Sequence, residues 1–215
     1  MDILLFANGE LKRGTMLERL LDSLASPHVI CADGGALQAR ALGLRPHTII
    51  GDLDSLTAEQ VAQFRAARAE VIQHPVEKDE TDLELALHHC RRIGAASIHI
   101  LGALGGRFDQ TIANIFLLTH SALRDMRIEV IDGEQVVRLL RPGAHRIDGE
   151  RGDTVSLIPL AAAEGIRTRG LQYPLAEETL HLGPARGISN VMLRESVEVA
   201  FRAGLLLVVH TSGRA

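Results

Sequence analysis

The first 125 residues alternate short apolar runs with segments of helical periodicity. Five runs have the length and composition of strands: Ile3–Ala7, His28–Ala32, Thr48–Gly51, Glu70–Gln73 and Ser97–Leu101. A helical segment follows each run, and this alternation predicts a parallel sheet with helices on both faces.

Two of the helical segments are distinctive. In the helix expected after Asp79, apolar residues recur at helical spacing from Leu83 to Cys90, and Gly94 provides a stop. Residues 111–123 are apolar nearly all round, which predicts a central buried helix.

The pattern changes after Met126. Short β-type segments follow, separated by Gly, Pro and Asp, at 127–131, 135–140, 154–159, 196–201 and 205–210. They predict antiparallel structure. We therefore expect an α/β domain over residues 1–132 and a smaller antiparallel β-sandwich domain over residues 133–215.

Composition narrows the class of protein. The chain has 215 residues and a formal net charge of -4, which argues against nucleic-acid binding through a basic surface. Cys31 and Cys90 form no metal-spaced motif, and they fit a reduced, cytoplasmic protein better than a disulfide framework. We expect neither a signal peptide nor a membrane-spanning segment, because no basic leader and no long apolar stretch is present.

An apolar strand ends in two carboxylates, Asp52 and Asp54. At positions i and i+2 of an extended chain they lie on the same side. Two ionised carboxylates about 4 Å apart repel each other by roughly 4 kcal/mol at an effective dielectric constant of about 20, so a cation is expected there. Oxygen ligands without a nearby His or Cys favour Mg²⁺. The alternative is that both residues only form a turn and cap a helix beginning near Thr57.

Polar loops follow the other predicted strands as well. In an open sheet of this Rossmann-like kind, ligands bind beyond the carboxyl ends of the strands. We therefore expect a nucleotide to contact residues from five loops: Asn8, Gly9, Asp33, Gly34, Ser55, Lys78, Gly105, Gly106 and Arg107.

Several of these residues have competing interpretations. Asp79 has the position of a helix N-cap, with Asp82 three residues later; we place both among the metal ligands, Asp82 ahead of Asp79. Gly105, Gly106 and Arg107 either form a simple turn or bind phosphate, with backbone amides approaching the phosphate oxygens and Arg107 binding them bidentately. Lys78, one of only two lysines, is either a point charge at a phosphate or a solvated side chain.

Two further positions are open at this stage. Asp109 is either an N-cap or a substrate contact. The His88–His89 pair stands in the middle of a helix without a spaced partner, which favours surface positions over metal ligation.

Together the motifs carry a family resemblance. They are, in order, Ala32-Asp33-Gly34-Gly35-Ala36, Gly51-Asp52-Leu53-Asp54-Ser55, Lys78-Asp79-Glu80-Thr81-Asp82, Gly105-Gly106-Arg107-Phe108-Asp109, Gly170-Leu171-Gln172-Tyr173-Pro174-Leu175 and Gly187-Ile188-Ser189-Asn190. The ordered set resembles the thiamine pyrophosphokinase family over nearly the whole chain.

The resemblance implies a homodimer in which the α/β domain holds Mg-ATP and the β-sandwich domain supplies part of the thiamine pocket, with active sites at the subunit interface. It places Asp52, Asp54 and Asp82 at the metal with Asp79 beside them, and Arg107 at phosphate.

The resemblance also implies substrate contacts from Asp109, Gln110, Tyr173, Ser189 and Asn190. Tyr173 would face the vitamin, and Ser189 and Asn190 would hold its pyrimidine. The chain departs from the family pattern in two places: Tyr173 stands where animal members have an indole, and Gln110 stands where many relatives have His.

The expected activity is transfer of the pyrophosphoryl group of ATP to the thiamine hydroxyl, giving thiamine diphosphate and AMP, with Asp52, Asp54, Asp82 and Arg107 as catalytic residues. Two alternatives are open. One is a haloacid-dehalogenase-like, Mg-dependent phosphatase, because Asp52-Leu53-Asp54 after a strand resembles its nucleophile motif. The other is a non-enzymatic nucleotide- or thiamine-sensing module.

Overall fold

The computed structural model describes residues 1–214. Contacts divide the chain into two units: the first contains Met1–Arg13 and Leu17–Gly133, and the second contains Gly14–Met16 and the residues from Glu134 onward. The helices are α1 (Thr15–Ser23), α2 (Gly35–Ala41), α3 (Ala58–Ala66), α4 (Asp82–Arg92), α5 (Phe108–Leu117) and the 3₁₀ turn η1 (Ser121–Leu123). Among the described residues, no helix combines the length and the apolar character that crossing a membrane requires.

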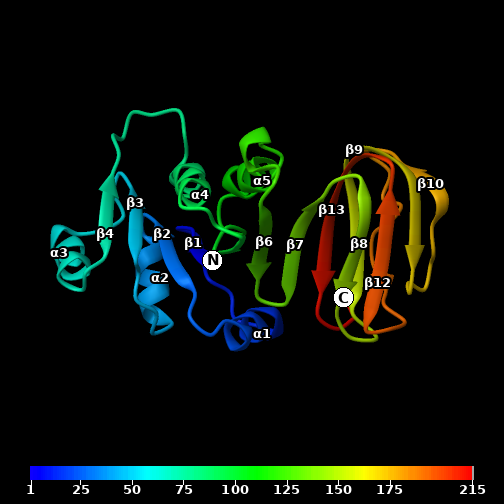
Figure 1. Cartoon of the computed structure of the whole chain (residues 1–215), viewed down its shortest axis with the longest axis horizontal. Coiled ribbons are helices and arrows are strands. Elements are labelled where there is room, and N and C mark those ends of the chain that lie inside the picture. The colour runs from blue at the N-terminus through cyan, green and yellow to red at the C-terminus, as the bar shows by residue number, and fades with distance from the viewer. Residues whose placement is uncertain (215) are drawn as a thin grey trace. The chain divides into compact units, whose positions relative to one another are not determined.

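The first unit contains a parallel sheet. Its strands are β1 (Asp2–Phe6), β2 (His28–Ala32), β3 (Thr48–Gly51), β4 (Glu70–Gln73), β5 (Ser97–Leu101) and β6 (Arg127–Asp132). Their spatial order is β4-β3-β2-β1-β5-β6, of which Figure 1 labels all strands but β5. All neighbouring pairs run parallel. The predicted parallel sheet is confirmed, and the five predicted strands match within one residue.

The strand order reverses between β1 and β5. Every residue of β5 is buried, including the polar Ser97 and His99, as are all but the first residue of β1, in keeping with parallel strands that are covered on both faces. Beyond their ends the two following loops touch: the Gly9 amide donates to the Gly102 carbonyl at 2.9 Å. A Cβ on Gly9 would lie 2.4 Å from that carbonyl oxygen, so this approach requires glycine. A reversal of this kind opens a ligand-binding crevice at the carboxyl edge.

The expectation for residues 127–131 is wrong. We assigned this segment to the antiparallel region, but β6 lies parallel to β5 and completes the first sheet. The chain between the two strands includes α5 and η1. A helical crossover of this kind joins parallel neighbours, and strand-like composition alone does not distinguish the two directions.

The buried helix expected over residues 111–123 is also wrong. The helix α5 ends at Leu117 and none of its residues is buried, whereas Leu118 and Leu123 beyond its end are. Phe108, Ile112 and Phe116 recur every four residues and are 78%, 37% and 54% exposed. They form an apolar strip, because side chains four positions apart lie on the same face of a helix.

The helix α4 has the predicted apolar stripe, with Leu83, Ala86, Leu87 and Cys90 all buried. Its N-cap is not Asp79, which is exposed, but Thr81, whose Oγ1 accepts a hydrogen bond from the Glu84 amide at 3.2 Å. His89 is buried against Arg92, so the surface expectation is wrong for His89.

The second unit is antiparallel. Its strands are β7 (Gln135–Leu140), β8 (Gly143–Asp148), β9 (Thr154–Arg169), β10 (Ala176–Leu180), β11 (Asn190–Val191), β12 (Ser196–Phe201) and β13 (Ala203–Thr211). The 16-residue strand β9 pairs with β13 through its first part and with β10 and β12 through its last part. Buried residues of both parts, including Val155, Leu157 and Ile166, belong to one apolar core. The predicted antiparallel region is therefore confirmed.

Candidate active site

The carboxyl ends of the first sheet border a cavity of about 560 Å³. Four of the five loop regions expected at this edge contribute to its lining, through Asn8 and Gly9, Asp54, Lys78 and Asp82, and Gly105, Gly106 and Arg107. The fifth region is represented only by Ala32, the last residue of β2. Of the other residues expected there, Asp33, Gly34, Asp52 and Ser55 lie outside the lining. Gln110 and Asn114 line it from α5. The predicted residues Asp79 and Asp109 are exposed and lie outside this lining.

Three carboxylates converge at this edge. Asp33 follows β2, Asp52 follows β3 and Asp82 begins α4, and one oxygen of each lies within 4.8 Å of the others. Asp33 is only 1% exposed, and its Oδ1 has no hydrogen-bond partner among residues 1–214. Burial raises the pKa of Asp33. An all-oxygen donor set with one buried, unpartnered oxygen fits a hard divalent cation such as Mg²⁺.

Asp52 and Asp54 are not arranged as the sequence suggested. Leu53 has a φ of +68°, so the chain turns and the two carboxylates do not share one side of an extended strand. Asp52 Oδ1 accepts the Asp54 amide at 3.2 Å, whereas the Asp54 side chain is exposed and lies outside the three-carboxylate group. The helix-cap alternative is wrong too, because Thr57 caps α3 in a capping box with Gln60.

Lys78 is the internal counter-ion of the carboxylates. Its Nζ lies 3.2 Å from Asp52 Oδ2 and 3.1 Å from Asp82 Oδ1, and its side chain is 12% exposed. Burial opposes the charge, but Asp82 and Asp52 together raise the pKa of Lys78. Burial likewise opposes the ionised form of Asp52, yet the Asp54 amide and Lys78 lower the pKa of Asp52. The alternative of a solvated Lys78 is therefore wrong.

A short polar network joins the loops after β1, β2 and β3. Asn8 Nδ2 donates to Asp33 Oδ2 at 3.2 Å and to Ser55 Oγ at 2.8 Å, and Ser55 Oγ donates to Asp54 Oδ1 at 3.1 Å. Gly34 makes the approach possible, since a Cβ there would lie 2.1 Å from Asn8 Oδ1. These residues hold the edge together and leave part of Asn8 facing the cavity.

The glycine-rich loop after β5 is turned by positive φ values at Gly102, Gly105 and Gly106. Arg107 is largely exposed and paired with Asp109, its Nε lying 3.1 Å from Asp109 Oδ1. Asp109 lies in the first turn of α5, and the N-cap position is occupied by Arg107. The N-cap expectation for Asp109 is therefore wrong. Sequence reasoning missed Asn114, whose Nδ2 donates to the Ala103 carbonyl at 2.8 Å while the residue lines the cavity. Its position two turns into an apolar helix gave no local signal.

The remaining predicted residues lie in the second unit. Tyr173 is 64% exposed. The side-chain amide of Asn190 is 2.7 Å from the Tyr173 carbonyl, to which it donates, and 3.0 Å from the Tyr173 amide, from which it accepts. Ser189 has a φ of +56° and its amide donates to Ser156 Oγ at 3.0 Å. Asn190 therefore fixes the backbone that carries the exposed phenol.

Known proteins share both sequence and structure with this chain. The family profile described as "Thiamin pyrophosphokinase, catalytic domain" matches residues 20–130, and the one described as "Thiamin pyrophosphokinase, vitamin B1 binding domain" matches residues 144–206. Thiamine pyrophosphokinase of Bacillus subtilis is 28% identical over 185 residues, which span 85% of this chain and 86% of that protein. Thiamine pyrophosphokinase 2 of Oryza sativa subsp. japonica is 31% identical over 208 residues, which span 84% and 76%.

Solved structures agree. The crystal structure of thiamine pyrophosphokinase from Bacillus subtilis has a TM-score of 0.87 at 27% identity and covers 99% of both chains. The crystal structure of thiamin pyrophosphokinase from Geobacillus thermodenitrificans has a TM-score of 0.84 at 27% identity, covering 99% of this chain and 98% of that one. On the match of the catalytic profile, and of a relative that is 31% identical over 84% of this chain, the chain belongs to the thiamine pyrophosphokinase family.

Proposed function

We propose that this protein transfers the pyrophosphoryl group of ATP to the hydroxyl of thiamine, giving thiamine diphosphate and AMP. The observation that carries the proposal is the group formed by Asp33, Asp52 and Asp82 with Lys78, placed beside a glycine-rich loop where the strand order reverses. A triphosphate needs both a cation and oxygen-binding donors, and both kinds of group border one cavity.

We assign a Mg²⁺ ion to Asp33, Asp52 and Asp82. When bound, the ion would neutralise negative charge on the phosphate oxygens. Asp79 is exposed and lies outside this group, so we do not assign it as a metal ligand. Asp54 lines the cavity without belonging to the group, and we assign it to orienting the attacking hydroxyl.

In the reaction we propose, the thiamine hydroxyl oxygen bonds to the β-phosphorus, the bond from that phosphorus to the α-phosphate oxygen breaks, and the hydroxyl proton is released. Lys78 holds the carboxylates in place and presents positive charge at the cavity wall. Arg107 and the amides of Gly105 and Gly106 bind phosphate oxygens, which requires the exposed Arg107 side chain to leave Asp109. Asn8, Gly9, Gly34 and Ser55 complete the nucleotide-binding edge.

We further propose a division of labour. Residues 1–132 form a Rossmann-like catalytic domain with helices on both faces, and residues 133–215 form a β-sandwich that binds thiamine and contributes to dimerisation. The two sets of partners of β9 support the sandwich. Tyr173 faces the vitamin, Ser189 and Asn190 line the pyrimidine site, and Asp109 and Gln110 contact substrate from α5.

The proposed assembly is a homodimer with active sites at the subunit interface. The exposed apolar strip of Phe108, Ile112 and Phe116 supports it, because such a strip gains stability when a second molecule covers it. We assign the protein to the cytoplasm, where the two buried cysteines stay as thiols. Sedimentation of wild type and a Phe116→Glu variant tests the dimer.

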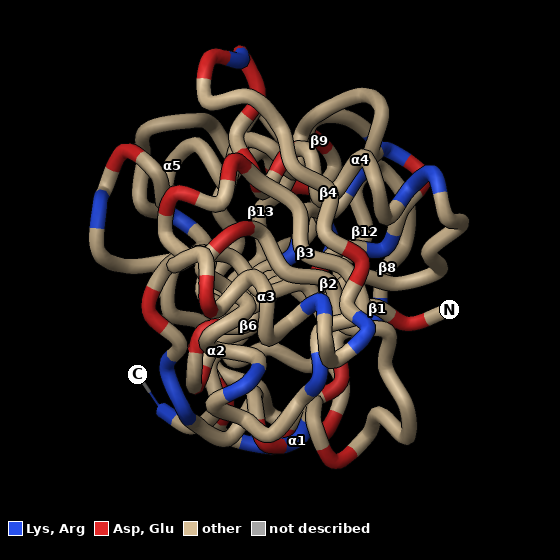
Figure 2. The backbone as a smooth tube through the Cα atoms, turned by 90° about the vertical axis from the view of Figure 1, so that its left-hand side faces the viewer, with Lys and Arg blue, Asp and Glu red and all other residues tan. Residues whose placement is uncertain are grey.

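The two alternatives have weaker support. A haloacid-dehalogenase-like nucleophile follows the first strand of its sheet, whereas Asp52 follows the third strand along the chain and is ion-paired to Lys78. A sensing module has no counterpart among the relatives named above, which are thiamine pyrophosphokinases. Figure 2 shows acidic and basic segments interspersed along the backbone and no broad basic face in that view, in line with a small-molecule site.

The test is AMP release from ATP and Mg²⁺, with and without thiamine. We expect thiamine-dependent AMP and an equal amount of thiamine diphosphate. Release of inorganic phosphate with trapping of a phosphoenzyme would favour the phosphatase, and binding without turnover would favour the sensor.

A further inference from the structure

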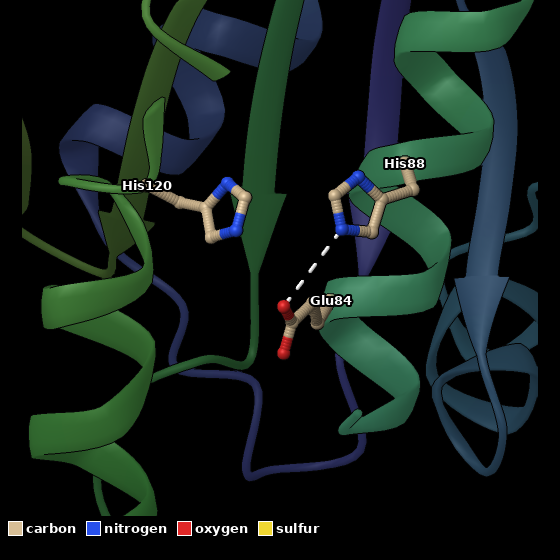
Figure 3. Close-up of side chains that lie close together, drawn as sticks. All are labelled: Glu84, His88 and His120. Carbon is tan, nitrogen blue, oxygen red and sulfur yellow. Dashed lines mark ion pairs between the residues drawn. The ribbon is translucent and has the colours of Figure 1, made fainter. Parts of the chain in front are cut away.

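A second group of metal-binding side chains lies outside the candidate active site. Glu84, His88 and His120 each offer a ligand atom, and these atoms lie within 4.8 Å of one another. Figure 3 shows the two imidazole rings on opposite sides of a gap, with the Glu84 carboxylate close to it; the ring planes are at 82° to each other. His88 Nε2 is 3.7 Å from Glu84 Oε1, and the two ring centroids are 5.4 Å apart.

We propose that Glu84, His88 and His120 bind Zn²⁺, with a water molecule as the fourth ligand. Two imidazoles and one carboxylate form a common three-residue zinc site. In a tetrahedral site with bonds of about 2.0–2.1 Å, ligand atoms lie roughly 3.3 Å apart. His88 Nε2 and Glu84 Oε1 are already 3.7 Å apart, and no pair of the three ligand atoms is more than 4.8 Å apart. Rotations of the three side chains can therefore close the site.

The fold holds these residues in position from two directions. Glu84 and His88 are one helical turn apart on α4, and His120 is the N-cap of η1, which packs against α4. The side chains of His88 and Glu84 are 38% and 23% exposed, so an ion reaches them from solvent. An ion bound here would tie η1 to the helix that begins with Asp82.

The donor set separates this site from the carboxylate group. Imidazole nitrogen suits zinc and its neighbours in the first transition series, whereas Mg²⁺ prefers oxygen ligands alone. An excess of Mg²⁺ therefore occupies Asp33, Asp52 and Asp82 without competing effectively at His88 and His120.

Zinc binding at His120 has a local consequence. His120 Nδ1 accepts the Ala122 amide at 3.1 Å, so Nδ1 carries no proton in this arrangement. Coordination through Nε2 places the ring proton on Nδ1 and breaks that hydrogen bond. The amide of Ala122 therefore reports on occupancy of the site.

The experiment is a Zn²⁺ titration of the untagged chain by calorimetry in excess Mg²⁺, without ATP or thiamine. His88→Gln and His120→Asn each remove one nitrogen ligand, and Asn at position 120 keeps a capping side chain. His181→Gln, at an exposed position of the second unit, is the matched control. We expect one Zn²⁺ in wild type and in His181→Gln, and affinity at least about tenfold weaker in the other two, since even outer partners of metal ligands contribute about that much.

Two further measurements keep the proposal falsifiable if a variant fails to fold. Co²⁺ substituted in wild type should show the intense visible bands of four-coordinate cobalt, and Zn²⁺ should shift the NMR signal of the Ala122 amide. The proposal is overturned if wild type binds no Zn²⁺ in excess Mg²⁺, if Ala122 does not respond, or if folded His88→Gln and His120→Asn bind as tightly as wild type. Because no substrate is present, none of these results depends on the proposed enzyme activity.

Discussion

One aspartate in each unit is almost completely buried, and the two have opposite surroundings. Asp33, 1% exposed, leaves Oδ1 without a hydrogen-bond partner among the described residues, and burial raises its pKa. Asp153, 3% exposed, accepts the Glu150 amide at 2.9 Å, His210 Nε2 at 2.8 Å and the Gly213 amide at 2.8 Å. Burial alone would raise the pKa of Asp153, but these donors lower it.

The comparison separates a structural carboxylate from a functional one. Asp153 is fully bonded within the chain, so its charge stabilises the loop that it holds. Asp33 Oδ2 accepts from Asn8, but its buried Oδ1 has no donor among the described residues. A buried oxygen of this kind persists where an external partner completes its bonding. Burial of an acidic residue therefore says little about its role until its hydrogen-bond partners are counted.

The largest effect is expected at Asp153. Asp153→Ala removes the acceptor of two backbone amides and of His210, and breaking a buried pair of this kind costs about 3–5 kcal/mol of unfolding free energy. Denaturant unfolding measures the loss. Asp148→Ala, at an exposed ion pair with Arg146, is the control and should change stability by less than about 1 kcal/mol. If both variants lost the same unfolding free energy, the proposed structural role of Asp153 would be wrong.

Asp52→Asn should affect activity instead. It removes one charge from the three-carboxylate group, and loss of one electrostatic contact in a site of this kind lowers kcat by about 10²–10³. Steady-state AMP release at limiting Mg²⁺ measures the effect, with circular dichroism to check folding. Asp79→Asn, which changes an exposed carboxylate outside the group, should keep near-wild-type activity. If the two variants were equally active, the metal assignment would be wrong.

Tyr173→Ala tests the division of labour between the units. The exposed phenol is proposed to cover a thiazolium cation, a contact that contributes about 0.5–2 kcal/mol, so the Michaelis constant for thiamine should rise roughly 2- to 30-fold. The constant for ATP should stay the same, whereas Arg107→Ala should chiefly raise the ATP value. Tyr173→Phe keeps the ring and is the matched control. If the Michaelis constant for thiamine were unchanged in folded Tyr173→Ala, Tyr173 would not be a thiamine-binding residue.

Asp33→Asn should change stability least. The φ of +47° at Asp33 suits asparagine as well as aspartate, and the substitution removes a buried charge whose Oδ1 has no hydrogen-bond partner among the described residues. We expect unfolding free energy to rise by about 0–1 kcal/mol while Mg²⁺-dependent turnover falls. If Asp33→Asn lost as much stability as Asp153→Ala, the proposed difference between the two aspartates would be wrong.

The two aspartates should also differ in the sign of their pH dependence. The pKa of Asp153 is lowered on folding, so its contribution is present above the unfolded value of about 3.9 and is lost as pH falls through the folded pKa. The pKa of Asp33 is raised, so its ionisation penalises the fold increasingly as pH rises from about 3.9 through its folded pKa. We expect the unfolding free energy, measured between about pH 3 and 7, to depend less on pH in both variants than in wild type. Asp153→Asn should lose the dependence at the acidic end of this range, and Asp33→Asn should lose it above about pH 3.9. Parallel curves would contradict the assigned directions.

Local sequence patterns determined much of this protein. The apolar runs of β1 to β5, the stripe of α4 and the polar residues after each strand depend on neighbours one to four positions apart, so their type and order are readable without a fold. The rule that ligands bind at the carboxyl ends of parallel strands then brings Asn8, Asp54, Lys78 and Arg107 to one edge, and all four line the same cavity. The family resemblance also rests on short ordered motifs.

Other features were decided only by the tertiary structure. Whether β6 is parallel depends on which strand it meets, and whether α5 is covered depends on what lies against it. The turn at Leu53 directs Asp54 away from Asp52. The third carboxylate near Asp52 and Asp82 is therefore Asp33, which comes from another loop. His88, which has Glu84 as a local neighbour one turn before it on α4, gained His120 as a further neighbour in the same way. These outcomes follow from contacts between residues far apart in the chain, which depend on the direction and packing of whole elements and leave no mark on local periodicity.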